Sequence, residues 1–434
     1  MSPQISFGKD AHETLPIPSA LPEPEAATGA VPKSTKPFSA FQHRNYQLWF
    51  SGQLVSVIGT WMQNIARSWL LYELSRSEFI LGLMGFVAAL PVLLITPWGG
   101  VLTDTLPKRR LLIFTQSIAM SLAFILALLT FRGTVQIWHI LLLAALNGAT
   151  NALDAPARQA FVVEMVGRED MQNAITLNSM LMNGARIVGP AIGGVLLAWV
   201  GSAWCFLLNG VSFLAVIGGL LGMQVQPQAV KVRLEKPLAQ FVAGLHYARS
   251  QRVIGGLLAI SVIFGVFGLA YAAILPAFVD KVLAMSAAGF AWVNAMIGVG
   301  AVLAALAMAV WGNKRRRGKL LWIANLAFPL VLIIFAYNPI PAIALFLAIF
   351  LGFGFMLQIN SLNVLLQLQV SDAMRGRVMS LFTLSFFGLA PFGSLLVGWV
   401  GEYLSLNLTI SLSAVVMLSG VLWVHLRMPE LRKL

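Results

Sequence analysis

The chain has 434 residues, of which 58% are hydrophobic and only 10% are charged, and its mean hydropathy is +0.82. A composition this apolar excludes a soluble domain and indicates an integral membrane protein. The net charge of +13 would suggest a nucleic-acid partner in a soluble protein, but here the basic residues lie in loops between apolar segments, so no nucleic acid is expected. The single cysteine, Cys205, cannot form an intramolecular disulfide.

The first 43 residues are polar and rich in Pro, Ser, Ala and Glu, with no apolar core long enough for a signal peptide. We expect residues 1–43 to be a disordered cytoplasmic tail. The apolar segments that follow are long enough to span a membrane, and none alternates as a barrel strand does. The predicted fold is all-α, with twelve transmembrane helices at 46–73, 80–101, 111–131, 135–155, 173–200, 203–223, 253–278, 288–311, 320–337, 342–366, 378–400 and 404–426.

Basic residues orient these predicted helices. Of the 29 Lys and Arg residues, only Arg76, Arg132 and Lys281 fall in loops on one side of the membrane, and Arg67 and Arg186 fall inside spans. Because loops rich in Lys and Arg stay in the cytoplasm, we expect both termini to be cytoplasmic.

The longest loop, 224–252, divides the chain into two halves of residues 44–223 and 253–426, followed by a short tail at 427–434. Apolar residues recur at helical spacing after Pro237, which predicts an amphipathic helix on the inner membrane surface; an unstructured linker is the alternative. The string Gly-Gly-Val-Leu-Leu-Ala-Trp-Val-Gly from Gly193 is echoed 200 residues later by Gly-Ser-Leu-Leu-Val-Gly-Trp-Val-Gly from Gly393. This repeat indicates that the halves arose by duplication.

Polar side chains are costly in lipid, so those inside spans should face a protein interior or a water-filled cavity. At 100° per residue they fall on one face of three predicted spans. The candidate substrate-pathway residues are Gln63, Asn64 and Arg67 in the first span, Asn147 and Asn151 in the fourth, and Asn360 and Asn363 in the tenth. The alternative is that these amides join one helix to another.

Arg186 falls near the middle of the fifth span, whereas the nearest acid by depth, Asp154, falls near the cytoplasmic end of the fourth. A direct ion pair across this difference in depth would require a broken helix. We therefore add Arg186 to the substrate pathway, where it would bind an anionic group such as a carboxylate or catecholate. The alternative is that it donates to backbone carbonyls or amides on neighbouring helices.

A string of small residues follows Arg186. It reads Gly189-Pro190-Ala-Ile-Gly193-Gly194. Small residues permit a close approach of two helices, and a proline kinks the span, so we expect a helix-packing motif. The string also resembles the fifth-helix motif of proton-coupled exporters.

The loop at 99–110 has the spacing Gly-x3-Asp-x4-Arg-Arg, formed by Gly100, Asp104, Arg109 and Arg110. This pattern resembles the signature loop between helices 2 and 3 of the major facilitator superfamily of transporters. Thr105 and Pro107 stand where the family pattern has a basic residue and a frequent glycine. The alternative is an ordinary positive-inside loop that contains an aspartate.

Four further strings, at 59–63, 151–159, 168–174 and 372–380, resemble the branch of that superfamily that contains the enterobactin exporter and related transmembrane secretion effectors. The resemblance covers about 41–428. It implies two pseudo-symmetric six-helix bundles in a bacterial inner (plasma) membrane, and proton-driven efflux (antiport) of siderophores or drug-like amphiphiles by alternating access. It also implies a monomer without a cofactor, whose partners are a small-molecule substrate, protons and membrane lipids.

Such a cycle needs a gate and a coupling group. We assign the conformational gate to loop residues that would meet when the cytoplasmic side is closed, namely Gly100, Asp104, Arg109 and Arg110 in one half and Arg375 and Arg377 in the other. Asp154, His139 and Glu73 are the candidates for proton coupling, and we favour Asp154 because a partly desolvated carboxylate holds a proton more readily. Sodium coupling and uniport are the alternatives.

The motifs of other protein classes argue against a membrane enzyme. The five His residues are scattered, and no His-Glu-x-x-His, paired-acid or Gly-Lys-Ser/Thr pattern appears, so no metal or nucleotide site is predicted. The remaining alternatives are an uncoupled facilitator or importer and, more distantly, a non-transporting scaffold or sensor.

Overall fold

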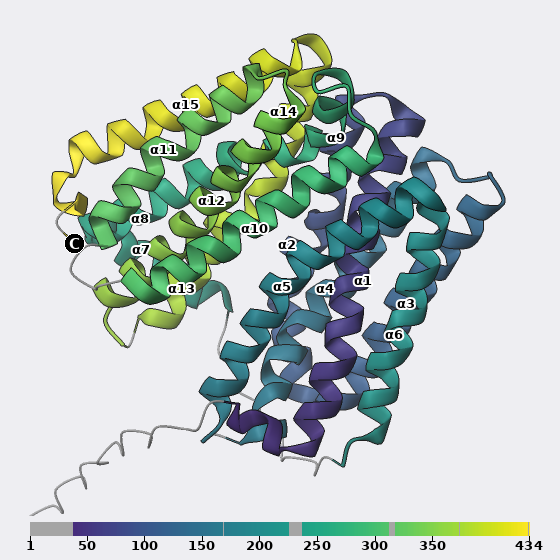
Figure 1. Ribbon diagram of the computed structural model, residues 1–434. Coiled ribbons are helices and arrows are strands. Elements are labelled where there is room, and N and C mark those ends of the chain that lie inside the picture. Colours follow the sequence, from purple (N-terminus) through teal and green to yellow (C-terminus); the bar gives the residue numbers. More distant parts are fainter. Residues whose placement is uncertain (1–37, 168, 225–236, 312–316, 373, 433) are drawn as a thin grey trace, which may run out of the picture. The chain divides into compact units, whose positions relative to one another are not determined.

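The computed structural model describes residues 38–434 except 168, 225–236, 312–316, 373 and 433, and the side chains at 97–104, 237–241, 309 and 311 also lie outside the description. The described residues belong to one compact unit, Pro37–Leu434. Every element among the described residues is helical (Figure 1). The expected tail at residues 1–37 lies outside the described residues.

The elements are named here as in Figure 1. The N-terminal half contains η1 (Ser39–Gln42), α1 (Arg44–Ser75), α2 (Glu78–Thr105), α3 (Lys108–Phe131), α4 (Ile137–Val166), α5 (Met171–Trp199) and α6 (Ser202–Gly222). The C-terminal half contains α7 (Pro237–Ser250), α8 (Arg252–Ile263), η2 (Phe264–Gly268), α9 (Tyr271–Lys281), α10 (Ala287–Trp311), α11 (Arg317–Tyr337), α12 (Pro341–Gln369), α13 (Arg375–Thr383), η4 (Leu384–Gly388), α14 (Ala390–Tyr403), α15 (Leu406–Arg427) and η5 (Pro429–Arg432).

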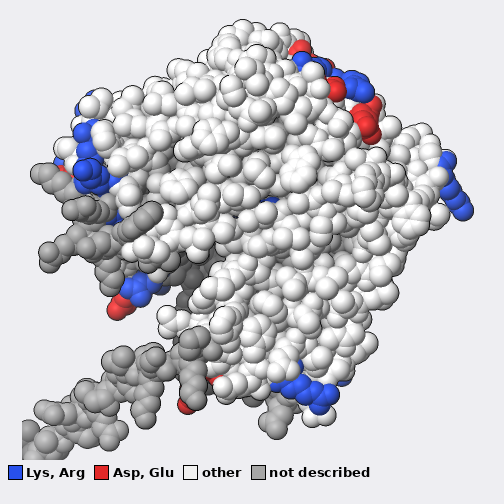
Figure 2. Space-filling view, in the orientation of Figure 1, with Lys and Arg blue, Asp and Glu red and all other residues white. Residues whose placement is uncertain are grey.

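Ten helical segments in the described part of the chain are long and apolar enough to cross a membrane. α1 and α4 are also long, at 32 and 30 residues, but carry more polar side chains. Figure 2 shows a broad uncharged surface on one face, with Lys, Arg, Asp and Glu gathered toward its borders. The chain is therefore a multi-pass membrane protein.

Glycines allow close helix contacts in both halves. A β-carbon at Gly148 of α4 would overlap the Ala88 carbonyl oxygen of α2. In the C-terminal half, a β-carbon at Gly352 of α12 would overlap the Ile297 carbonyl oxygen of α10 in the same way. The lack of a side chain at these two glycines lets the backbones approach each other. It allows close packing of α2 against α4 and of α10 against α12.

Two predicted spans of the C-terminal half are interrupted by π-turns. η2 separates α8 from α9, and η4 separates α13 from α14, so the expected spans 253–278 and 378–400 each consist of two helices. The Phe264 and Phe386 rings stack with centroids 5.3 Å apart, and a β-carbon at Gly265 would lie 2.5 Å from the Phe386 carbonyl oxygen. The two π-turns therefore pack against each other, and this contact stabilises both of them. The sequence alone does not distinguish these π-turns from ordinary α-helix.

The prediction placed the end of the fourth span too early in the chain. We expected it to end at 155, before Pro156, but α4 continues through Pro156 to Val166. A proline inside a helix removes one backbone hydrogen bond, and here buried packing of Phe161 and Met165 beyond it offsets that loss. Asp154 therefore lies well inside α4 and not at its end.

The start of the described chain also differs from the expected disordered tail. Ser39 of η1 donates to the Asp170 carboxylate at 2.5 Å, and the His43 ring nitrogen lies 2.8 Å from its second oxygen. These two contacts hold the pKa of Asp170 below its usual range. Residues 38–43 are thus attached to the start of α5.

Gly194 of α5 faces Ala291 of α10 in the other half, and a β-carbon at Gly194 would lie 2.5 Å from the Ala291 β-carbon. We expect Gly194→Ala to destabilise this contact by about 1–3 kcal/mol and to lower the Tm in detergent. Gly184→Ala is the matched control on the same helix, because a β-carbon there meets nothing within 4 Å. A Tm for Gly194→Ala at or above that of the control would contradict the close contact.

Candidate functional site

Ion pairs join the two halves at one end of the helices. Tyr72 and Arg76, at the end of α1, both donate to Asp280 of α9, at 2.7 and 2.9 Å. Lys281 of α9 pairs with Glu78 of α2 at 2.7 Å. We call this set, together with Ser77 and Glu402, the bridged end.

A second group of contacts extends the bridged end to α14. Glu402 accepts from the Ser77 hydroxyl at 2.7 Å and from the Phe79 backbone N–H at 3.1 Å. Glu78 is only 4% exposed, so its carboxylate depends on the Lys281 ammonium for compensation. The ends of α1, α2, α9 and α14 are therefore held together. Sequence reasoning missed this set, because its members lie about 200 residues or more apart in the chain.

The opposite end carries η1 and η5, and we call it the tail end. Basic side chains there bond within their own half, since Lys108 pairs with Glu164 at 2.6 Å and Arg375 pairs with Asp372 at 2.5 Å. Figure 1 shows the tail-end turns of α5 well apart from α7 and α13. The halves thus meet at the bridged end and are separated at the tail end.

Arg186 lies where the two halves meet, midway along α5. Its guanidinium carbon is 5.1 Å from the ring centroid of Trp61 on α1 and 5.7 Å from that of Phe355 on α12. Among the described residues it forms neither an ion pair nor a hydrogen bond, so its five N–H donors are available. The expected alternative, donation to carbonyls or amides, is therefore not what the structure has. We call these three residues the Arg186 site.

The packing motif after Arg186 holds α5 against both halves. A β-carbon at Gly189 would overlap the Trp61 β-carbon, and one at Gly193 would lie 3.2 Å from the Met62 Cα, both on α1. Pro190 lies inside α5 and is buried. Gly194 faces α10 instead. These contacts place Trp61 beside Arg186.

All three predicted pathway residues on α1 have hydrogen-bond partners. Gln63 accepts from the Asn209 amide of α6 at 2.8 Å in a buried contact, so it joins two helices. Arg67 donates to Asn64 at 3.1 Å within α1, and its Nε is buried without a partner. Arg67 and Asn64 thus retain unused polar capacity, whereas Gln63 has the role of a packing amide.

The two pathway residues on α4 bond to each other, and one of the two on α12 bonds to a neighbouring amide. Asn151 is exposed and donates to Asn147 at 2.8 Å, and the exposed Gln367 donates to Asn363 at 2.6 Å. Asn360 is half-buried. The exposed Asn151 amide lies near the middle of α4, at a depth where it needs water or ligand around it.

Asp154 is the centre of a buried network. Its carboxylate is 2% exposed and accepts from Thr115 and Gln116 of α3, at 2.8 Å each, and from Arg158 of α4. Arg158 also donates to Gln53 of α1 at 3.3 Å. The partner Arg158 could have been found in the sequence, because residues four apart are neighbours on a helix.

Among the described side chains, the predicted gate residues of one half form no hydrogen bond or ion pair with those of the other. Gly100 and Asp104 lie in the last turns of α2, where the surroundings of residues 97–104 lie outside the description. Arg109 donates to the Leu220 and Leu221 carbonyl oxygens at 2.6 and 2.8 Å. The remaining gate residues are Arg110, which is exposed, Arg375, which pairs with Asp372, and Arg377, which lies 3.3 Å from the Met374 sulfur. Their gating role stays a prediction.

Solved structures share this fold. The nucleoside transporter NupG matches with a TM-score of 0.69 at 13% sequence identity, covering 90% of this chain and 98% of that one. A bacterial homologue of the iron transporter ferroportin, in an inward-facing state, matches with a TM-score of 0.64 at 15% identity, covering 90% and 99%. The fold is that of a major facilitator superfamily transporter.

Sequence comparison gives the family. The staphyloferrin A transporter of Staphylococcus aureus is 26% identical over 374 residues, which cover 84% of this chain and 92% of that protein. The enterobactin exporter of Shigella boydii is 26% identical over 369 residues, covering 84% and 86%. The family described as transmembrane secretion effector matches residues 35–434, and the chain belongs to it. The predicted resemblance is confirmed, and the members of this family are transporters, which are not enzymes.

Asp280→Asn removes the negative charge that accepts from both Tyr72 and Arg76. It should raise the population with a separated bridged end by about two- to fivefold, because a partly exposed ion pair contributes up to about 1 kcal/mol. Spin labels at Thr134→Cys and Pro339→Cys, in exposed loops of opposite halves, would report the distance. The native Cys205 is buried and stays unlabelled.

Glu169→Gln is the control for this measurement, because it removes one negative charge from an exposed position away from the bridged end. An unchanged distance distribution in Asp280→Asn would contradict the bridging role. An equal change in both variants would do so as well.

Proposed function

We propose that this chain is a secondary active exporter of anionic siderophores or drug-like amphiphiles that works by alternating access. The observation that carries the proposal is the Arg186 guanidinium, held between Trp61 and Phe355 without an acidic partner among the described residues. A cation in such surroundings is stabilised by an anion, and the rings offer stacking area to an aromatic ligand. The relatives' names, which mention staphyloferrin A and enterobactin, support siderophores as substrates.

In this proposal twelve helices cross a bacterial inner membrane, with both termini in the cytoplasm. The ten apolar segments together with α1 and α4 supply that number. The orientation follows from the basic residues at the tail end, namely Lys108, Arg109, Arg110, Arg375 and Arg377, because positive loops stay cytoplasmic. The described conformation is then inward-facing, with the Arg186 site reached from the cytoplasm.

Transport requires the opposite conformation, in which the bridged end separates and the tail end closes. The tail-end residues proposed to meet are Asp104, Arg109 and Arg110 in one half and Arg375 and Arg377 in the other. Contacts that exist in only one conformation shift the population toward it.

Proton coupling is proposed at Asp154. Protonation would remove the negative charge that holds Arg158, and Arg158 links α4 to Gln53 of α1. An uncoupled facilitator or importer is the alternative function, and a non-transporting scaffold or sensor is the more distant one. Neither alternative requires a titratable group in this position.

Transport into inverted membrane vesicles with an imposed pH gradient tests the Arg186 site, using enterobactin and staphyloferrin A as probes. Arg186→Met should lower the initial rate by about tenfold or more, and Arg186→Lys should restore part of it, because an ammonium keeps the charge but lacks the planar fork. Arg132→Gln, in an exposed loop, is the control and should behave as the wild type. A normal initial rate in Arg186→Met would contradict the Arg186 site. If the wild type takes up neither probe, siderophores are excluded as the substrate class.

The coupling residue is tested by comparing two assays. Asp154→Asn should abolish accumulation driven by the pH gradient but keep substrate exchange, because exchange moves no net protons. In Asp154→Asn alone, Arg158 loses its ionic partner, which could destabilise the fold. The double variant with Arg158→Gln removes that charge as well, so it distinguishes a loss of coupling from a loss of folding. The control is Glu169→Gln, at an exposed position. Gradient-driven accumulation by Asp154→Asn would overturn the assignment, and gradient-independent equilibration by the wild type would favour a facilitator.

A further inference from the structure

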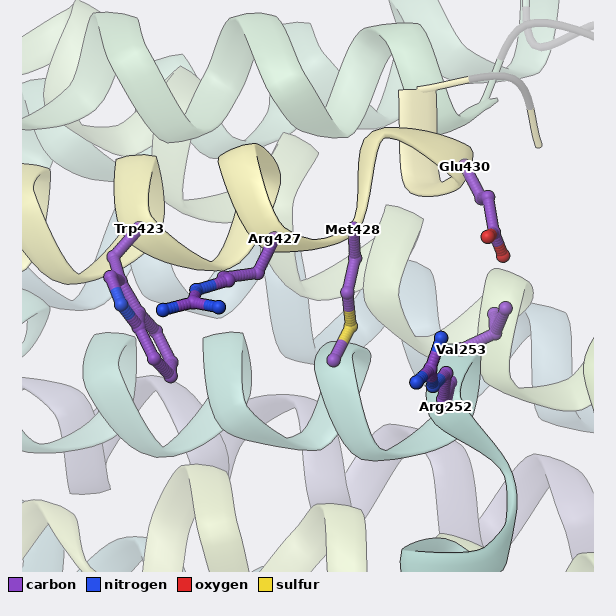
Figure 3. Close-up of a pocket in the computed structure, with 6 residues that line it drawn as sticks. All are labelled: Arg252, Val253, Trp423, Arg427, Met428 and Glu430. Atoms are coloured by element: carbon purple, nitrogen blue, oxygen red, sulfur yellow. The ribbon is translucent and has the colours of Figure 1, made fainter.

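A pocket of about 360 Å³ opens at the tail end of the C-terminal half, between the start of α8 and the end of α15. Its lining consists of Arg252, Val253, Trp423, Arg427, Met428 and Glu430 (Figure 3). None of these residues belongs to the substrate pathway or to the proposed gate. The volume is in the range of small-molecule sites, so the pocket can hold a ligand headgroup.

The pocket is electropositive. Arg252 begins α8, whose N-terminus adds partial positive charge, and Arg427 ends α15 with its guanidinium carbon 6.0 Å from the Trp423 ring centroid. Within the described residues neither guanidinium forms an ion pair or a hydrogen bond. Glu430 is the opposing carboxylate in the lining, and Figure 3 shows it at the far side from Trp423 and Arg427. Two cations and one acid leave an excess of positive charge for an anion.

The exposed surface of α15 leads to this pocket. An exposed stripe at helical spacing is formed by Leu412, Val416, Ser419, Trp423 and Leu426. Trp423 is 60% and Leu426 is 73% exposed. Apolar side chains exposed on a membrane helix face acyl chains, and tryptophan prefers the depth of the headgroups. A molecule with its tails along this stripe would place its headgroup between the two arginines.

We infer that the pocket binds the phosphate of an anionic phospholipid from the surrounding leaflet. Phosphate oxygens accept the paired N–H donors of Arg252 and Arg427, while the acyl chains lie along the α15 stripe. A soluble phosphate ester would use the arginines but not the stripe, and the stripe is therefore what assigns a lipid. The bound lipid links the start of α8 to the end of α15 and anchors this half in its leaflet.

Native mass spectrometry of the full chain, released from phosphatidylcholine nanodiscs that contain phosphatidylglycerol, measures the retained lipid. The wild type should retain phosphatidylglycerol in preference to phosphatidylcholine. Arg252→Gln with Arg427→Gln should lower that retention by about tenfold or more. Glu430→Gln should raise it, because the opposing carboxylate is removed.

The matched control is Arg44→Gln with Arg132→Gln, which removes the same charge from exposed positions in the other half and should leave retention unchanged. Equal retention by the double pocket variant and the wild type would overturn the site. Lower retention by Glu430→Gln would also overturn it, independently of whether the double variant folds. If millimolar inorganic phosphate displaces the lipid, the pocket binds a soluble anion and the proposal of a lipid site is overturned.

Discussion

The unpaired charge of Arg186 constrains both halves of the molecule. Its guanidinium must be satisfied by ligand or water at a depth where hydrocarbon would reject it, and its ring contacts come from one helix of each half. α5 reaches this position because Gly189 removes the side chain that would collide with α1, while Gly298 of α10 lies against the Arg186 carbonyl oxygen. A side chain at either glycine would force the helices apart. The half-buried cation and the close packing therefore depend on each other.

Under the proposed alternating access the bridged end has to separate, and its ionic character suits a contact that breaks. Exposed ion pairs such as Arg76 with Asp280 each contribute little to stability. Removing only one partner of the Lys281–Glu78 pair would cost more, because the Glu78 carboxylate is buried and would be left unpaired. Charged groups regain hydration when such a contact separates, so part of the lost attraction is recovered from water. An apolar seal of the same area would gain nothing on opening. Arg109 is bonded to two backbone carbonyls of its own half. Under the proposed gating, closing the tail end would therefore exchange these contacts for new ones and would not only add contacts.

Much of the fold could be predicted because hydropathy over about twenty residues is a local property of the chain. Arg186 was also recognisable locally, as a charge inside an apolar run. The partner of Asp154 was missed for a specific reason, since ending the span before Pro156 hid that Arg158 follows one helical turn later. The bridged end could not be predicted, because Tyr72 and Asp280 meet only through the packing of distant helices. The paired π-turns likewise depend on each other and not on a local signal.

In the proposed mechanism, α1 links the proton site at Asp154 to the substrate site at Arg186, which do not touch each other. Gln53, which accepts from Arg158, and Trp61, which lies against Arg186, are eight residues apart on this helix, about 12 Å along its axis. Under the proposed coupling, neutralising Asp154 releases Arg158 and weakens the hold of α4 on α1. Trp61 moves with α1, so the surroundings of Arg186 change although no carboxylate approaches it. An acid beside Arg186 would instead compete with an anionic substrate for the same donors, and its absence among the described residues is what this mechanism requires.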